Sequence, residues 1–378
     1  MLLILQIIIL SLLILGTINF LLNLWVVKVV SPKLKLEKDL PLVSILIPAR
    51  NEANNITDCL KSFQNQTYTN LEILVLDDES QDETSLKVSI LAKEDQRIKL
   101  LKGQALPAKW VGKNWACYQL SQVAQGDWLL FTDADTRFQP QAISASIAYA
   151  TLNKADLLSI FPKQLASTRA VQVIIPLVYF IFYTVFPGIF LAKSRYVFAA
   201  IGQFLLFNKK AYQEIDGHKG VYTSIIEDID LAKTIKLAGK TLVLGDGNLL
   251  VSCQMYESLR ELWKGCTKNL FACFSYSIIN LSIFILLYLS LYIWPFIALL
   301  IYPIVEVRFE FLILVLLQLL LVYMIRILLA QRHCTTIFSI LLHPVAILVM
   351  LANSFYSMYR VTSKQGVEWK GRAYQPKS

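Results

Sequence analysis

The chain has 378 residues, of which 56% are hydrophobic and 17% are charged, and its formal net charge is +9. Charged residues make up about a quarter of an ordinary soluble chain, so this composition excludes a wholly soluble protein and indicates that a large part lies in lipid. The lysines and arginines cluster beside apolar stretches, and no basic-aromatic nucleic-acid motif is present. A membrane surface and phosphate-bearing substrates are therefore favoured over nucleic acid as partners.

Cysteine and histidine show no metal-ligand spacing. The six cysteines are scattered without a CxxC pair, and the three histidines form no zinc pattern. We expect the cysteines to be small buried side chains in a reducing compartment.

Residues 1–30 form an almost unbroken apolar run. The run is long enough to cross a bilayer, and it has neither the basic start nor the small-residue cleavage site of a signal peptide. We predict an N-terminal transmembrane anchor. By the positive-inside rule, its basic flank lies in the cytosol together with the domain that follows; the flank contains Lys28, Lys33, Lys35 and Lys38.

Residues 41–256 have the composition of a soluble α/β domain. Polar, helix-compatible stretches alternate with short apolar runs at residues 43–47, 71–76, 98–101 and 128–132. This alternation predicts a mostly parallel, Rossmann-like sheet wrapped by helices. A very apolar stretch near residues 171–191, broken by Pro176 and Pro187, interrupts the pattern. We interpret it as a segment in the membrane interface, because the soluble pattern resumes directly after it.

Residues 257–271 carry Arg260, Lys264 and Lys268 at every fourth position. On a helix these residues form one basic stripe, as in an interfacial helix that touches anionic headgroups, although an ordinary solvated face is the alternative. Residues 272–359 follow as a C-terminal transmembrane region, with apolar runs of spanning length at residues 277–304, 311–330 and 337–358.

The sequence leaves open on which side of the membrane the basic tail, residues 360–378, lies. One span before the α/β domain and three after it would leave the tail outside, whereas the positive-inside rule prefers it in the cytosol. A break at Trp294-Pro295 or at His343-Pro344 would make one run re-entrant or double. We favour an integral, multi-pass protein with a cytosolic tail, and the number of spans stays open.

Polar residues follow the first two predicted strands. The first strand ends at Pro48, Arg50 and Glu52, and the second delivers Asp77 and Asp78, then Glu79 and Ser80. In open α/β sheets, ligands bind at the carboxyl ends of strands, and acidic residues there suit hydrogen bonds to a base or ribose. Ordinary turn chemistry is the alternative for either element alone.

Two carboxylates follow a later apolar strand at Asp133 and Asp135. One residue apart, they can direct oxygen to one hard cation, and Mg²⁺ or Mn²⁺ held in this way keeps positions open for substrate phosphates. The sequence therefore predicts a metal site here.

Glu227 and Asp228 form a second acidic pair. Ser224 with Glu227 fits a capping box, so Glu227 has a purely structural alternative. Asp228 is not needed for the helix cap, and we predict it to be the general base. Lys109 and Lys113, which flank Trp110 and Gly112, suit a diphosphate, although a solvated basic loop is equally consistent with the sequence.

In this order, the four elements resemble the inverting family-2 glycosyltransferases with the GT-A fold, from about residue 43 to residue 269. The resemblance implies that Asp133 and Asp135 hold Mg²⁺ or Mn²⁺ on the donor diphosphate and that Asp228, beside Glu227, is the catalytic base. It also implies contacts to the nucleotide-sugar from Pro48, Arg50, Glu52, Asp77, Asp78, Lys113 and Asp133.

Finer features look like the branch of this family that glycosylates carotenoids, hopanoid-related lipids and ceramide. The stretches that carry the likeness are residues 109–115, 202–207 and 369–374. Candidate contacts to acceptor or diphosphate are Gln203 and, in the tail, Trp369, Lys370 and Arg372, for which an ordinary interfacial anchor is the alternative. Arg260 and Trp263 are further candidates, and their role stays open because they stand where relatives carry QxxRW. The QxxRW motif of processive polysaccharide synthases is absent, which argues against polymer synthesis.

The resemblance therefore implies an inverting hexosyltransferase that moves a sugar from a nucleotide-sugar, UDP-linked by preference, to a hydroxyl of a membrane lipid or isoprenoid. A processive or polyprenyl-phosphate enzyme is the first alternative. A non-catalytic nucleotide-sugar sensor or scaffold is the second. The sugar, the lipid and the oligomeric state stay open.

Overall fold

The computed structural model describes residues 2–36, 40–304, 308–363, 365, 367–369 and 372–374. The chain divides into two compact units. The sheet unit contains Val26–Leu165 and Ile189–Met255, and the helical unit contains Met1–Trp25, Ala166–Gly188 and Tyr256–Ser378.

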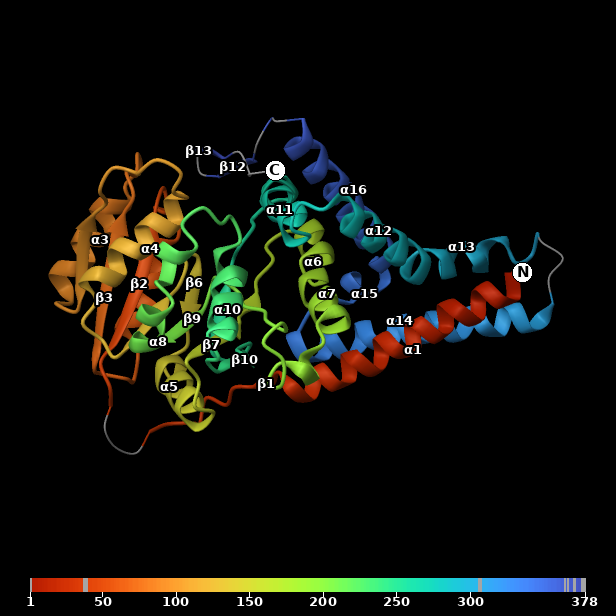
Figure 1. The fold of residues 1–378 in the computed structure, drawn as a ribbon, viewed down its shortest axis with the longest axis horizontal. Helices are drawn as coiled ribbons and strands as arrows, with labels where there is room; N and C mark the ends of the chain where they lie inside the picture. The colour runs from red at the N-terminus through yellow and green to blue at the C-terminus, as the bar shows by residue number, and fades with distance from the viewer. Residues whose placement is uncertain are drawn as a thin grey trace. The chain divides into compact units, whose positions relative to one another are not determined.

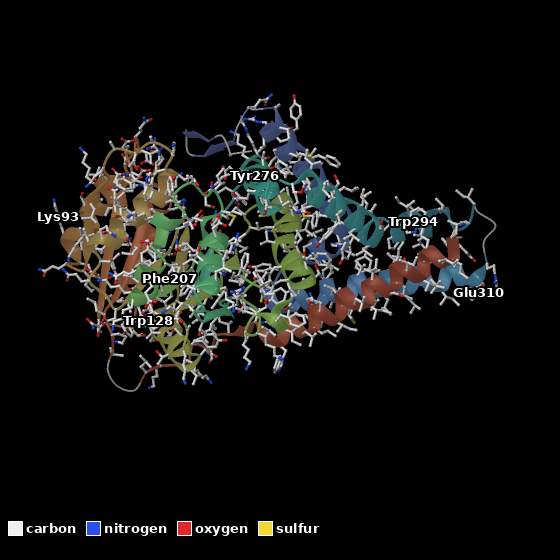
Figure 2. The ribbon with its side chains drawn as sticks, viewed as in Figure 1. Lys93, Trp128, Phe207, Tyr276, Trp294 and Glu310 are labelled. Carbon is white, nitrogen blue, oxygen red and sulfur yellow. The ribbon has the colours of Figure 1, made fainter. Side chains whose placement is uncertain are left out.

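A mostly parallel sheet forms the centre of the sheet unit. Its strand order is β1 (Lys28–Val29), β10 (Leu242–Asp246), β7 (Leu157–Phe161), β9 (Leu205–Asn208), β5 (Trp128–Phe131), β2 (Val43–Ala49), β3 (Leu71–Asp77) and β4 (Ile98–Lys102). Only β9 runs antiparallel to its neighbours in this sheet as described, and it lies between β5 and β7. Figure 2 labels Trp128 on β5 and Phe207 on β9. The four strands predicted from apolar runs are confirmed as β2, β3, β4 and β5.

Helices cover the sheet, which explains why its strands are apolar on both faces. They are α2 (Ile56–Gln64), α3 (Thr84–Glu94), α4 (Gly112–Val123), α5 (Ala142–Leu152), α8 (Lys209–Glu214), α9 (Gly217–Gly220) and α10 (Glu227–Leu237). Figure 1 shows α3 and α4 beside β2 and β3. The α2 helix buries Ile56, Cys59, Leu60 and Phe63, a helical spacing that turns one face into the core.

A small second sheet adjoins the strand ends of this unit. Its order is β6 (Thr136–Phe138), β11 (Val251–Cys253) and β8 (Lys163–Gln164). Because β6 starts directly after Asp135, this sheet fixes the chain on the far side of the Asp133–Asp135 pair.

The helical unit is built from long apolar helices and shorter segments. They are α1 (Leu2–Val26), α6 (Arg169–Ile174), α7 (Leu177–Val185), α11 (Leu259–Cys273), α12 (Ile278–Tyr292), α13 (Trp294–Ile301), α14 (Phe309–His333), α15 (Ile337–Leu341) and α16 (His343–Thr362). The 3₁₀ turn η1 (Gly188–Phe190) follows α7, and the tail contains the hairpin β12 (Val367–Trp369) and β13 (Arg372–Tyr374).

Buried polar side chains join the long helices. In Figure 1, α1 runs beside α14, and Gln318 Nε2 donates to Gln6 Oε1 at 2.8 Å. At the other end of α1, Asn23 Nδ2 donates to Tyr183 O at 2.9 Å, and its Oδ1 accepts from Gly188 N at 3.0 Å. The outer faces of α1 and α14 expose isoleucine and leucine, as lipid-facing helices do.

Among the described residues, three helices are long and apolar enough to cross a membrane: Leu2–Val26, Phe309–His333 and His343–Thr362. A fourth is possible if Leu259–Cys273 and Ile278–Tyr292, which meet at a bend of 114°, count as one broken span. The α6–α7 segment, Arg169–Val185, is shorter than a span by this measure. Its place in the membrane interface stays a prediction.

The C-terminal runs differ from three simple spans. Residues 277–304 break into α12 and α13, and the last run divides into α15 and α16. Pro295 and Pro344 each stand in the first turn of the second helix of the pair, where proline is tolerated although it cannot continue a preceding helix. Figure 2 labels Trp294 at the first of these breaks. Both of the breaks considered from the sequence are therefore present.

We predict that Gly126→Ala destabilises the sheet unit by about 1–3 kcal/mol, because overpacking forces the backbone to move. A Cβ at Gly126 would lie 2.6 Å from Ser44 N and 2.8 Å from Leu42 O, and neither backbone atom can shift without disturbing β2. Thermal unfolding in detergent measures the loss. Gly16→Ala is the matched control, since a Cβ there meets nothing within 4 Å. Equal melting of Gly126→Ala and the wild type would contradict the prediction.

Candidate active site

The predicted polar residues meet at one edge of the main sheet. Strands β5, β2 and β3 are adjacent and parallel, with Leu46 opposite Phe131 and Ala49 opposite Asp77. Their carboxyl ends therefore deliver residues 48–52, 77–80 and 132–135 to the same edge, where ligands of α/β sheets bind.

Hydrogen bonds tie the first two of these loops together. Arg50 Nη1 donates to Asp78 O at 2.6 Å, and Asn51 N donates to Ser80 Oγ at 3.0 Å. Asp77 accepts from Ser80 N at 3.2 Å and from Ser85 Oγ at 2.5 Å. The loops are thus preorganised, and the contacts of Pro48, Arg50, Glu52, Asp77 and Asp78 with a nucleotide stay predictions.

Lys113 joins the two acidic pairs. Its Nζ lies 2.8 Å from Asp133 Oδ1 and 2.9 Å from Glu227 Oε1, and its side chain is 17% exposed. Burial by itself would lower the pKa of Lys113, but the Asp133 and Glu227 carboxylates outweigh burial and raise that pKa well above its ordinary value. The ammonium is therefore permanently charged. Its predicted contact with a diphosphate stays a prediction.

Asp135 is a half-buried carboxylate whose Oδ1 is shielded from solvent and whose bonding is incomplete. Burial, then the charges of Asp133 and Glu52, raise its pKa to about 7, while a hydrogen bond with the Cys253 thiol opposes the shift. Its Oδ1 has no hydrogen-bond partner among the described residues. A divalent cation would supply the missing positive charge.

The acidic edge therefore fits a hard cation. No group of three or more histidine, cysteine, aspartate or glutamate side chains forms a metal cage within the described part of the chain. Mg²⁺ and Mn²⁺ do not require such a cage, because water and substrate phosphates complete their coordination. Asp133 and Asp135 are the residues that would hold the cation.

The capping-box interpretation of Glu227 is wrong. The α10 helix has Ile226 at its N-cap, with no side-chain cap bond, and Ser224 Oγ accepts from Ile226 N at 3.2 Å. The helix starts too late for Ser224 to cap it, so the Glu227 carboxylate is available to pair with Lys113.

Asp228 is held by two backbone donors. Gly202 N donates to its Oδ2 at 2.8 Å, and Ile229 N donates to its Oδ1 at 2.9 Å. Burial, followed by the Glu227 charge, raises the pKa of Asp228 to about 6, while Lys113 and the backbone donors oppose the rise. A carboxylate with a pKa near neutral pH is suited to accept a proton from a hydroxyl group.

Asn114 is a site residue that the sequence did not reveal. Its buried Nδ2 donates to Val221 O and Ser224 O, both at 2.9 Å. Asn114 thus clamps the loop that leads into Glu227 and Asp228, next to the lysine that binds Glu227. Its acceptors lie 107 and 110 residues away, so no local pattern could identify the clamp.

His218 and three cysteines have packing roles at this edge. Burial lowers the pKa of His218 to about 3, so the ring is neutral, and its Nδ1 lies 2.9 Å from Tyr212 Oη. Cys59, Cys117 and Cys253 are buried free thiols, as predicted, whereas Cys273 and Cys334 are exposed.

The predicted acceptor contacts divide between the two units. Gln203 is buried in the sheet unit next to Gly202, and its Oε1 accepts from Gln164 Nε2 at 2.9 Å. Arg260 is exposed on α11 of the helical unit, and Trp263 packs 5.9 Å from the Tyr356 ring. Trp369 and Arg372 belong to the backbone of β12 and β13, while their side chains and Lys370 lie outside the described residues.

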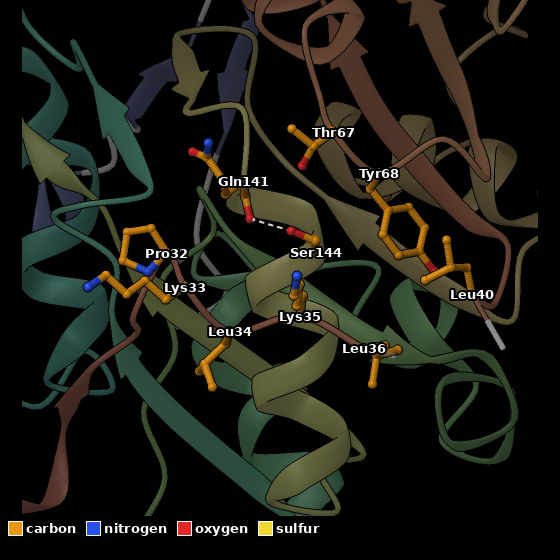
Figure 3. A pocket seen from close by; sticks show the side chains of 10 residues that line it. All are labelled: Pro32, Lys33, Leu34, Lys35, Leu36, Leu40, Thr67, Tyr68, Gln141 and Ser144. Atoms are coloured by element: carbon orange, nitrogen blue, oxygen red, sulfur yellow. Dashed lines mark hydrogen bonds between the residues drawn. The ribbon is translucent and has the colours of Figure 1, made fainter. Parts of the chain in front are cut away.

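A pocket of about 420 Å³ lies elsewhere on the sheet unit. Figure 3 shows residues 32–36 and Leu40 facing Thr67, Tyr68, Gln141 and Ser144. Its lining contains lysines but no carboxylate. It therefore lacks the chemistry of the acidic edge.

The sheet order and the position of the acidic edge define the GT-A class of fold. A mannosyltransferase from Pyrobaculum calidifontis, solved with GDP-Man and Mn²⁺, has a similar fold, with a TM-score of 0.53 and 14% identity over 94% of this chain and 99% of that one. Residues 44–216 match the glycosyl transferase family 2 model, so the chain carries a domain of that family. The resemblance inferred from the four motifs is confirmed.

Curated relatives with similar sequences are glycosyltransferases. A 4,4'-diaponeurosporenoate glycosyltransferase from Staphylococcus haemolyticus is 29% identical over 60% of this chain and 60% of its own length. An Escherichia coli UDP-Glc:alpha-D-GlcNAc-diphosphoundecaprenol beta-1,3-glucosyltransferase is 38% identical over 25% of this chain and 35% of its own. A beta-monoglucosyldiacylglycerol synthase from Nostoc sp. is 34% identical over 27% of this chain and 22% of its own. The chain thus spans less than two thirds of the length of each.

We predict that Lys113→Met lowers the free energy of unfolding of the sheet unit by about 3 kcal/mol, because it leaves two paired carboxylates without their cation. Added Mn²⁺ should recover part of the loss by replacing the missing charge. Thermal unfolding with and without Mn²⁺ checks both outcomes. Lys109→Met, at an exposed lysine just before α4, is the control and should melt like the wild type.

Proposed function

We propose that this protein transfers a hexose, with inversion, from a nucleotide-sugar to a hydroxyl of a membrane lipid or isoprenoid. The observation that carries the proposal is the Lys113 bridge between Asp133 and Glu227. It joins a candidate metal pair and a candidate base at one sheet edge, in a chain whose described part also contains three helices able to span a membrane.

Asp228 is the base in this proposal. The acceptor oxygen attacks the anomeric carbon, the bond from that carbon to the diphosphate oxygen breaks, and the hydroxyl proton passes to the Asp228 carboxylate. The backbone donors at Gly202 and Ile229 orient the carboxylate, and burial keeps its pKa near 6. Asn114 fixes the loop that carries it.

Asp133 and Asp135 would hold Mg²⁺ or Mn²⁺. When bound, the cation neutralises negative charge on the donor diphosphate. The buried, unbonded Oδ1 of Asp135 supports this assignment, as does the Mn²⁺ in the Pyrobaculum calidifontis neighbour. Lys113 supplies a further fixed positive charge at the same place.

Three observations support a lipid-like acceptor. The described part of the chain carries helices able to span a membrane. The α11 helix exposes Arg260 and Lys264 and buries Leu262, Phe271 and Ala272. The curated relatives are named for a carotenoid acid, a diphosphoundecaprenol-linked sugar and a diacylglycerol. We also propose a multi-pass integral protein with the sheet unit in the cytosol, because lysines follow α1.

A polyprenyl-diphosphate-linked acceptor is the second candidate, favoured by the Escherichia coli relative. Polymer synthesis is disfavoured, because the α11 region reads Arg260-Glu261-Leu262-Trp263 without QxxRW. Acceptor trials with carotenoid, diacylglycerol and undecaprenyl diphosphate sugars separate the candidates.

Purified protein should transfer radiolabel from UDP-glucose, or from another sugar nucleotide offered in parallel, to lipid extract in the presence of Mg²⁺ or Mn²⁺. Label in the organic phase reports transfer. Chelation with EDTA and the Asp135→Ala substitution should each abolish the transfer of label, because both eliminate the cation that stabilises the departing diphosphate. Metal-dependent nucleotide binding without turnover on any donor would favour a sensor instead.

Asp228→Asn should lower the transfer rate by about 10²–10⁴-fold, the range that a general base contributes, while donor binding is retained. In the wild type, kcat/KM should fall as the pH drops through about 6, because protonation of Asp228 removes the base. A pH–rate profile with saturating metal checks this limb. Turnover near the wild-type rate in Asp228→Asn would remove Asp228 from the role.

A further inference from the structure

Two buried side chains of the helical unit have unused hydrogen-bonding atoms. Arg326 on α14 is 1% exposed and His343 at the start of α16 is fully buried. One guanidinium nitrogen, Nη2, donates to Ser339 O. The other two, Nε and Nη1, and both ring nitrogens of His343 have no hydrogen-bond partner among the described residues.

Arg326 and His343 both lie next to the ring of Phe180. The Arg326 guanidinium carbon lies 5.6 Å from the Phe180 ring centroid, and the His343 ring lies 4.7 Å from the same ring. The ring centroid of Tyr292 lies 5.0 Å from that of Phe180 and 5.9 Å from that of His343. Helices α7, α12, α14 and α16 therefore converge on one cationic, aromatic-walled position.

The charge of Arg326 has no protein counter-ion in the described part of the chain. Three carboxylates of this unit have described side chains: Glu310 pairs with Arg308 at 2.7 Å, Glu261 accepts from Glu257 N at 2.9 Å, and Glu257 is exposed. A buried, unpaired charge is strongly destabilising, and an ionisable residue inside a membrane segment usually faces a partner or a ligand. Arg326 thus requires an anion that the described chain does not provide.

The position suits an anion carried by an amphiphile. Arg326 lies seven residues before the C-terminal end of α14, about 10 Å along the helix. That end is fixed to the C-terminal part of α1 by Arg332 Nη1, which donates to Leu24 O at 3.0 Å. A group at this depth lies near the level at which the polar end of a lipid enters the hydrocarbon.

We propose that Arg326 and His343 form a binding site for the oxyanion, a carboxylate or a phosphate, of a membrane amphiphile. The guanidinium group binds carboxylate and phosphate oxygens, and the Nε and Nη1 atoms of Arg326 each keep an unused N–H that can donate to such an oxygen. The His343 ring adds an N–H donor. The aromatic rings exclude water and enclose the apolar part next to the anion. The site stands independently of the transferase activity.

The test measures retention of radiolabelled probes by the full-length protein in a non-ionic detergent. The probes are dioleoyl phosphatidylglycerol for the phosphate, palmitate for the carboxylate and dioleoylglycerol as a neutral amphiphile with the same tails. We expect the wild type to retain at least one anionic probe about tenfold or more above the neutral one, the factor that a charged hydrogen bond supplies. Whichever anionic probe the protein retains better shows whether the site binds a phosphate or a carboxylate.

Arg326→Gln should reduce anion retention by about tenfold or more, and His343→Phe should reduce it to a lesser extent. Arg308→Gln, at an arginine that is 76% exposed at the other end of α14, is the matched control and should bind like the wild type. If Arg326→Gln is not monodisperse, Arg326→Met replaces it in the same measurement, because methionine is a long side chain that buries no polar group. Equal retention of all three probes by the wild type, or undiminished anion retention in an Arg326 variant, overturns the proposal.

Discussion

The ammonium of Lys113, between Asp133 and Glu227, is the interaction on which the site depends. Its three residues come from the first turn of α4, the chain after β5 and the start of α10. Carboxylates repel one another strongly where the dielectric is low, and the half-buried Asp135 and Asp228 lie close to this cluster. One half-buried cation offsets part of the repulsion among four acidic residues at one sheet edge.

In this arrangement the carboxylates of the site are only partly neutralised. Burial is the first cause of the raised pKa of both Asp135 and Asp228, and neighbouring carboxylates add to it. Groups arranged in this way destabilise the free protein and favour ligands that bring positive charge or accept protons. Asn114 and the two backbone donors to Asp228 keep the arrangement from relaxing. The rigid apolar sheet behind the site makes that strain tolerable.

The helical unit obeys a different constraint, because apolar contacts give little preference for another helix over lipid. Its helices are joined instead by buried polar groups. Gln6 pairs with Gln318, Asn23 binds the turn after α7, and Asn353 donates to Trp263 O at 2.9 Å. Each of these groups makes at least one hydrogen bond to another helix or turn of the unit, although Gln6 Nε2 and Gln318 Oε1 have no partner among the described residues. Arg326 and His343 occupy the same kind of position, but Arg326 brings a charge that has no counter-ion in the described part of the chain, which favours a ligand site over a helix contact.

The sequence by itself determined the class of protein. Apolar runs located β2, β3, β4 and β5, acidic residues at strand ends marked the candidate site, and the long apolar helices indicated a membrane protein. Only the tertiary structure showed β9 inserted antiparallel, the pairing of Lys113 with Asp133 and Glu227, and the Asn114 clamp. It also corrected the cap role of Glu227 and located Arg326 beside His343. Local periodicity and turn chemistry act over a few residues and can be read from the chain. Contacts between side chains about a hundred residues apart depend on the order of the strands and the packing of the helices, which spacing does not encode.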